Sequence, residues 1–125
     1  MTIPSGHQQV MPYLMLSNAK RFIDFIETVF GARMNMVAER EDGSGIMHAE
    51  CAIGSSTIMF TDATEEWKPA PANLFIYVED ADKTYEAALT AGSVSIQPPQ
   101  DKDYGRACGV SDPFGNVWWI TSITR

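Results

Sequence analysis

Apolar residues recur at helical spacing in a stretch near the start of the chain. Asn18 offers a side-chain oxygen that can cap a helix, and Gly31 permits the left-handed turn that ends one. Between them the apolar positions fall at i, i+3, i+4, i+7 and i+8, namely Phe22, Phe25, Ile26, Val29 and Phe30. That spacing places them on one face of a helix. We therefore predict an amphipathic helix between Asn18 and Gly31.

A second stretch repeats the first. Asp80 takes the capping position, Gly92 ends the segment, and the apolar face consists of Ala81, Tyr85, Ala88 and Leu89. Asn18 and Asp80 are 62 positions apart, and Gly31 and Gly92 are 61 positions apart. A repeat this long in a chain of 125 residues indicates two copies of one supersecondary unit, because a solenoid needs more copies.

Each predicted helix follows one short apolar stretch and precedes three more. The candidate strands cover residues 10–16, 33–40, 46–53 and 56–61 in the first copy, and residues 74–78, 94–96, 107–111 and 117–121 in the second. Pro98 and Pro99 are expected to break the strand at 94–96, and residues 100–105 to form a loop. The pattern predicts one α+β domain over residues 1–125, made of modules 9–62 and 73–122 with a linker at 63–72.

Composition and charge exclude several partners. The chain is 45% hydrophobic and 20% charged, as in ordinary soluble proteins. No apolar stretch approaches the roughly 18 residues that a membrane span needs, so we expect no membrane partner. The sequence also shows no signal-peptide pattern, so we expect a cytoplasmic location. The net charge of −7 argues against a nucleic-acid partner, because phosphate binding needs clustered Lys and Arg.

Familiar catalytic motifs are missing. Cys51 and Cys108 lie outside any Cys-x-x-Cys motif, and we expect them to be reduced thiols. His7 and His48 are the only histidines, and they are too far apart for a His-Glu-x-x-His zinc motif. The sequence also has no glycine-rich phosphate loop and no Gly-x-Ser-x-Gly.

Several short motifs carry a family resemblance. They are Phe30-Gly31-Ala32, His48-Ala49-Glu50, Asp103-Tyr104-Gly105-Arg106 and Asp112-Pro113-Phe114-Gly115-Asn116-Val117-Trp118. Together they resemble the glyoxalase, bleomycin-resistance and extradiol-dioxygenase superfamily, also called the vicinal oxygen chelate (VOC) superfamily, and its small bacterial glyoxalase-like branch in particular. The resemblance covers about residues 10–122. It implies two βαβββ modules that form a curved mixed sheet around a central cavity, in a homodimer.

The resemblance also implies four metal-ligand positions, in the first and last strand of each module. Counted from the repeats, these positions fall on Met11, Met59, Asn73 and Trp119. Family metalloenzymes place His and Glu there, because a divalent ion needs imidazole or carboxylate donors. Thioethers, an amide and a donor-only indole cannot replace them. We therefore expect no bound metal and no other cofactor.

Strand alternation predicts which side chains line the implied cavity. The predicted ligand-binding residues are Met11, Tyr13, His48, Glu50, Met59, Phe75, Tyr77 and Trp119, with Tyr104 and Arg106 in a loop that could close over a ligand. Such a lining suits a flat apolar or aromatic compound, neutral or cationic, held by ring stacking and one ionic contact. The Met and aromatic residues could equally fill the cavity as core.

Three functions remain open. The first is metal-free binding of a small compound in the cavity. The second is a VOC-type metalloenzyme (a lyase, dioxygenase or isomerase), in which His48 and Glu50 form a repositioned metal site or act as general acid and base. The third is a structural or partner-binding module with a filled interior. We favour the first, since the usual ligands are absent from the sequence.

Overall fold

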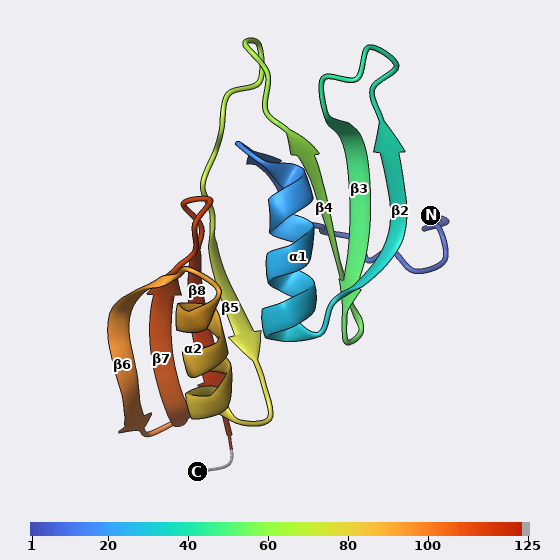
Figure 1. Cartoon of the computed structure of the whole chain (residues 1–125). Helices are drawn as coiled ribbons and strands as arrows, with labels where there is room; N and C mark the ends of the chain where they lie inside the picture. Colours follow the sequence, from blue (N-terminus) through green and yellow to red (C-terminus); the bar gives the residue numbers. More distant parts are fainter. Residues whose placement is uncertain (124–125) are drawn as a thin grey trace. The chain divides into compact units, whose positions relative to one another are not determined.

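The structure, a computed structural model, describes residues 1–123 of the chain. Its internal contacts divide the chain into two compact units (Figure 1). The first unit holds Met1–Glu27 and Gly31–Ala70, and the second holds Thr28–Phe30 and the chain from Pro71 onward. The boundary at Ala70 lies inside the segment predicted as a linker.

The first unit contains a four-stranded mixed sheet. The elements of this part of the chain are β1 (Tyr13–Leu16), α1 (Ala19–Phe30), β2 (Arg33–Glu39), β3 (Ile46–Ile53) and β4 (Ser56–Asp62), and the last three residues of α1 count with the second unit. The strand order is β1-β4-β3-β2, with β1 parallel to β4 and the other neighbours antiparallel. The strands predicted at 46–53 and 56–61 leave only Gly54 and Ser55 between them, and the pairing of Ile53 with Ser56 confirms this two-residue hairpin. The predicted strand–helix–three-strand order is therefore confirmed for this unit.

Helix α1 begins and ends where its sequence predicts. The Asn18 side chain accepts a hydrogen bond from the Arg21 amide at 3.1 Å, and Gly31 ends the helix with φ 66°. Phe22, Phe25 and Ile26 of the apolar stripe are buried, and the Phe22 and Phe60 rings meet edge to face with centroids 5.1 Å apart. This burial accounts for most of the stability of so short a helix.

The second unit has the same order of elements. They are β5 (Asn73–Tyr77), α2 (Ala81–Thr90), β6 (Val94–Lys102), β7 (Gly105–Ser111) and β8 (Val117–Ser122). The strand order is β5-β8-β7-β6, with β5 parallel to β8. The Asp80 side chain caps α2 by accepting a hydrogen bond from the Lys83 amide at 3.1 Å.

The predicted break at Pro98 and Pro99 is wrong, because β6 continues through both prolines to Lys102. β6 lies at the edge of its sheet, where a residue without an N–H can leave its outer side unpaired. The pairing with β7 also skips between Gln97 and Gln100, so the prolines coincide with an irregularity in the ladder. Residues 100–102 are therefore strand rather than loop.

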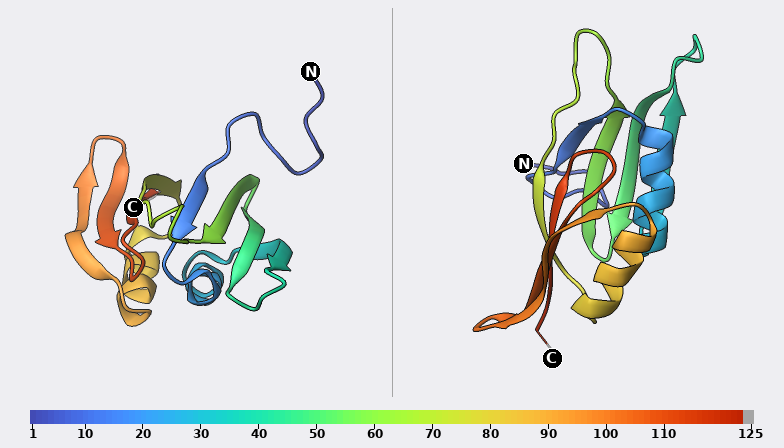
Figure 2. Two further views of the ribbon diagram at one scale, coloured as in Figure 1. Left: turned by 90° about the horizontal axis from the view of Figure 1, so that it is seen from above. Right: turned by 60° about the vertical axis from the view of Figure 1, so that its left-hand side comes forward.

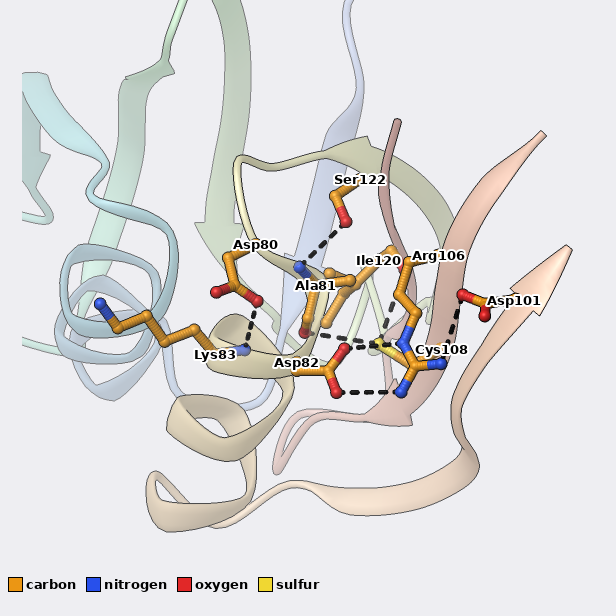
Figure 3. Close-up of polar contacts among 9 residues, drawn as sticks. All are labelled: Asp80, Ala81, Asp82, Lys83, Asp101, Arg106, Cys108, Ile120 and Ser122. Atoms are coloured by element: carbon orange, nitrogen blue, oxygen red, sulfur yellow. Dashed lines mark hydrogen bonds and ion pairs between the residues drawn. The ribbon is translucent and has the colours of Figure 1, made fainter. Parts of the chain in front are cut away.

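The last strand of each unit satisfies the first amide of that unit's helix. The Asp62 carboxylate at the end of β4 accepts a hydrogen bond from the Ala19 amide at 2.7 Å. The Ser122 hydroxyl at the end of β8 accepts one from the Ala81 amide at 3.2 Å (Figure 3). The repeat seen in the sequence thus extends to the way each helix start is tied to its sheet.

Both cysteines are buried free thiols, Cys51 in the first unit and Cys108 in the second. Burial raises the pKa of each thiol to about 11. Within residues 1–123, neither helix combines the length and the apolar character that crossing a membrane requires.

Candidate functional site

The first sheet has a buried face and an open face. The buried face packs on α1 and includes Leu14, Leu16 and Phe60, each 3% exposed or less. Tyr13 and Met15 alternate with these leucines and point to the other face, where Tyr13 is 49% exposed. Glu50 pairs with Met59 across β3 and β4, as the hairpin register predicts.

A pocket of about 440 Å³ opens at one end of this face. It lies where β1 and β4 end. The β2–β3 turn and the segment after β4 lie beside it, and both are found at one end of the sheet in Figure 1. Its walls combine aromatic and thioether side chains with three polar residues: Tyr13, Met15, Met47, Trp67, Arg40, Thr61 and Asp62. All seven residues belong to the first unit.

Trp67 reaches the pocket because the segment after β4 folds back on β1. The Thr64 hydroxyl accepts a hydrogen bond from the Trp67 amide at 2.9 Å, and the Trp67 carbonyl accepts one from the Thr64 amide at 2.8 Å. Ala70 then forms a β-bridge with Met15. The predicted linker therefore supplies one wall of the pocket, which strand alternation could not reveal.

Met47 reaches the pocket through an irregularity in β3. On β2 the pairing moves by one residue, from Ala38 to Glu39, while on β3 it moves by two, from His48 to Ile46. Met47 is the extra residue of this β-bulge. The Thr61 hydroxyl donates to the Met47 carbonyl at 2.8 Å, which gives that carbonyl a partner beside the bulge. A bulge breaks simple alternation, so the sequence did not assign Met47 to the lining.

Arg40 and Asp62 form the polar corner of the pocket. Arg40 Nη2 donates to the Asp62 carbonyl at 2.8 Å and to the Thr61 hydroxyl at 3.3 Å. The Asp62 carboxylate accepts hydrogen bonds from the Ala19 and Ile46 amides, both at 2.7 Å. Both carboxylate oxygens are thus held by backbone amides, one of which begins α1, where the helix dipole favours negative charge.

Glu50 lies between two histidines on the same open face. His7 Nε2 is 2.7 Å from Glu50 Oε1, and His48 Nε2 is 3.0 Å from Glu50 Oε2. These hydrogen bonds, first from His7 and then from His48, hold the pKa of the Glu50 carboxyl below its usual value. The Tyr13 ring meets the His48 ring edge to face at 5.8 Å. The cluster therefore adjoins the pocket through Tyr13.

His7 belongs to an N-terminal segment that lies on the open face. Gln8 donates through its side-chain amide to the Thr57 carbonyl at 2.8 Å and accepts from the Thr57 amide at 3.3 Å. The Thr57 hydroxyl donates to the Gly6 carbonyl. Figure 2 shows this segment and α1 on opposite faces of the first sheet. The polar residues 1–8, with Pro4 and Gly6, predict a loose tail, whereas residues 6–8 are held on the sheet by these hydrogen bonds.

The second sheet carries the predicted aromatic residues of β5 and β8 on its face away from α2. Phe75 and Tyr77 are 53% and 67% exposed, and their rings meet edge to face at 5.2 Å. Trp119 Nε1 donates to the Asn73 side-chain oxygen at 3.1 Å. A Cβ on Gly109 would lie 2.6 Å from the Trp119 ring, so glycine is needed for the indole to rest on β7.

Arg106 is engaged within the second unit. Its guanidinium donates to both carboxylate oxygens of Asp82, at 2.9 and 3.1 Å, and to Asp101 at 3.4 Å (Figure 3). These contacts lower the pKa of the Asp82 carboxyl and raise that of the guanidinium. Tyr104 is 56% exposed nearby in the chain, between β6 and β7. The predicted role of Arg106 and Tyr104 as a ligand clamp stays a prediction.

The four positions implied as metal ligands do not fit a divalent ion. In the first unit the Met59 amide donates to the carbonyl of Pro12, which follows Met11, so the two thioether residues lie close along the sheet. In the second unit the Asn73 side-chain oxygen is already bonded to the Trp119 indole. Among the described residues, no three side chains of His, Cys, Asp or Glu are placed to hold a metal ion.

Comparison with known proteins gives the family. Residues 8–120 match the family model of the Glyoxalase/Bleomycin resistance protein/Dioxygenase superfamily. The chain belongs to this superfamily. The resemblance drawn from the short motifs is confirmed, and so is the α+β class with two βαβββ modules. Each module forms a four-stranded mixed sheet of its own, rather than part of the single curved sheet that the resemblance implied.

Several individual proteins resemble the chain over most of its length. The uncharacterized protein Mb0911c of Mycobacterium bovis is 28% identical, with 91% of this chain and 82% of that protein covered. The structure of TioX from Micromonospora sp. ML1 is similar with a TM-score of 0.71 at 24% identity, covering 92% of this chain and 95% of that one. TnmS3, an antibiotic binding protein from Streptomyces sp. CB03234, has a TM-score of 0.72 at 20% identity, covering 98% of each chain.

Proposed function

We propose that the chain is a metal-free binding protein that holds a small planar aromatic compound in the pocket of its first unit. The pocket itself carries the proposal. Its volume of about 440 Å³ is that of a small-molecule site. Tyr13 and Trp67 offer ring faces for stacking, and Met15 and Met47 offer polarizable thioethers that adapt to a flat surface.

The exposure of these side chains supports binding over core packing. Tyr13, Met47 and Trp67 are 49%, 53% and 61% exposed, so they do not fill the interior of the unit. A bound ring system would remove their apolar surface from water, which stabilises a complex. TnmS3, whose name describes antibiotic binding, shows that the shared fold is compatible with this kind of role.

A second candidate function rests on the Glu50 cluster. A carboxylate that orients an imidazole beside a pocket is a common arrangement for general acid and base catalysis. His48 contacts Glu50 and lies against Tyr13, which lines the pocket. His48→Ala and Glu50→Gln would abolish a turnover that depends on this pair. They would leave the affinity of a compound bound by the pocket walls almost unchanged.

Calorimetric titration of chelator-treated protein with a panel of planar aromatic compounds tests the binding proposal. We expect saturable binding that weakens about five- to tenfold in Met47→Ala. Met47 is 53% exposed, so a ligand would bury about half of its side chain, which contributes about half of the 1.5–3 kcal/mol of a fully buried Met. Met36→Ala is the matched control, because Met36 is 42% exposed on the neighbouring strand β2 and does not line the pocket. Equal affinities of the two variants, or binding that requires an added divalent metal, would contradict the proposal. The predicted homodimer and cytoplasmic location stay predictions.

A further inference from the structure

We infer that the pocket selects planar aromatic compounds bearing an anionic group, such as a carboxylate, which the Arg40 guanidinium binds. The inference rests on the proposed function and adds the charge of the ligand. It differs from the expectation of a neutral or cationic compound, for which Glu50 offered the ionic contact.

Glu50 is poorly available for a ligand. Both of its carboxylate oxygens accept hydrogen bonds from imidazoles, at 2.7 and 3.0 Å, and its side chain is only 15% exposed. A cationic ligand would have to displace His7 or His48 from these contacts. The ionic contact expected from the sequence is therefore already made inside the protein.

Arg40 is held in position and keeps donors for a ligand. Its two side-chain hydrogen bonds to protein, to the Asp62 carbonyl and the Thr61 hydroxyl, are both donated by Nη2. A guanidinium has five N–H donors in a planar fork, and the fork matches a carboxylate with two parallel hydrogen bonds. Within residues 1–123, no carboxylate oxygen lies within 4.0 Å of the guanidinium nitrogens. Fixing one edge of the guanidinium lowers the entropy lost when the other edge binds.

Two acidic groups near Arg40, Asp62 and Asp42, are themselves engaged. The Asp62 carboxylate also lines the pocket, but its two oxygens accept from the Ala19 and Ile46 amides. Asp42 lies two residues after Arg40 in the turn and accepts from the Ser44 amide at 2.9 Å. The chain as a whole carries a net charge of −7, which disfavours anions. Arg40 is the cationic side chain in the pocket lining, so we attribute a preference for an anionic compound to it.

Three compounds with one ring system test the inference: naphthoate, its neutral amide, and naphthylmethylammonium. We expect calorimetry to show naphthoate binding about tenfold or more tightly than the amide, since hydrogen bonds to charged groups are the strong ones. Arg40→Gln should reverse this order, so that the amide binds more tightly than naphthoate. Arg33→Gln removes the same charge from an exposed position on β2 outside the pocket, and it should keep the wild-type order.

The outcomes separate the inference from the proposed function. Saturable binding of all three compounds with equal affinity, or a preference for naphthoate that survives in Arg40→Gln, would overturn the role of Arg40 and leave the binding proposal standing. Tighter binding of the ammonium compound would overturn it in favour of a cationic ligand. Failure of all three to bind, with the protein folded by circular dichroism, would overturn both.

Discussion

Gly45 is a position where one added carbon should destabilise the fold by a measurable amount. A Cβ built there lies 2.5 Å from Asp62 Oδ2 and 3.1 Å from its Cγ, and the backbone has φ +137°. The same Oδ2 accepts the Ile46 amide at 2.7 Å. Gly45→Ala therefore forces the carboxylate away from that amide, in addition to straining the backbone.

The matched control is Gly43→Ala in the same turn. Gly43 also has a positive φ, +75°, but nothing lies within 4 Å of its added Cβ. Gly43→Ala should cost about 1–2 kcal/mol of unfolding free energy from strain alone. Gly45→Ala should cost about 3–5 kcal/mol, because it adds the loss of a charge-assisted hydrogen bond of about 1.5–3 kcal/mol.

Urea unfolding followed by circular dichroism and by tryptophan fluorescence measures both values, and coincident transitions justify comparing them. In an Asp62→Ala background the clash is gone, so Gly45→Ala should cost no more than the strain component. The double-mutant cycle between positions 45 and 62 should give a coupling of about 1.5–3 kcal/mol. A coupling near zero, or equal losses for the two glycine variants, would refute the reasoning.

Three further predictions concern groups outside the pocket. Cys51 and Cys108, with pKa values of about 11, should resist alkylation at pH 8 in the folded protein and react fully in denaturant. Mass spectrometry measures the labelling, and rapid labelling of either thiol in the folded protein would contradict its burial. Because the folded protein lowers the pKa of the Glu50 carboxyl, the ionised carboxylate stabilises the fold fully above its usual pKa, and this stabilisation is lost as the pH falls through the lowered value. Glu50→Gln should therefore be about 1–3 kcal/mol less stable than the wild type at pH 7. Urea unfolding at a series of pH values should show this difference vanish in acid, and a constant difference would contradict the prediction. Gly109→Ala should displace the Trp119 indole and cost about 1–3 kcal/mol in the same assay, and an unchanged indole resonance and stability would show that the ring does not need this glycine.

The fold could be predicted from the sequence because its signals are local and repeated. Asn18 and Gly31 mark the ends of α1 by capping chemistry. Asp80, 62 positions after Asn18, marks the start of α2 in the same way. The failure came at Pro98 and Pro99, since a proline argues against a central strand but not against an edge strand. Which strand is at an edge depends on sheet order, and local sequence does not encode sheet order.

The candidate site was only partly predictable. Alternation along β1 placed Tyr13 on the open face, and the hairpin register placed Glu50 opposite Met59. Met47 was missed because a bulge changes its face. Trp67 was missed because it lies in an irregular segment, although a lone Trp among polar and proline residues is a signal that could have drawn attention to it.

One spectrum would test the central claim most directly. The chain has three tryptophans, and each indole N–H gives a separate NMR signal. Trp118 is buried with its N–H bonded to Asp112, Trp119 is bonded to Asn73, and Trp67 lines the pocket. When naphthoate is titrated into chelator-treated protein, we predict a saturable shift of the Trp67 signal while the Trp118 signal stays in place. A Trp67 signal that does not move while the Trp119 signal does, or no response without added metal, would contradict a metal-free site in the first unit.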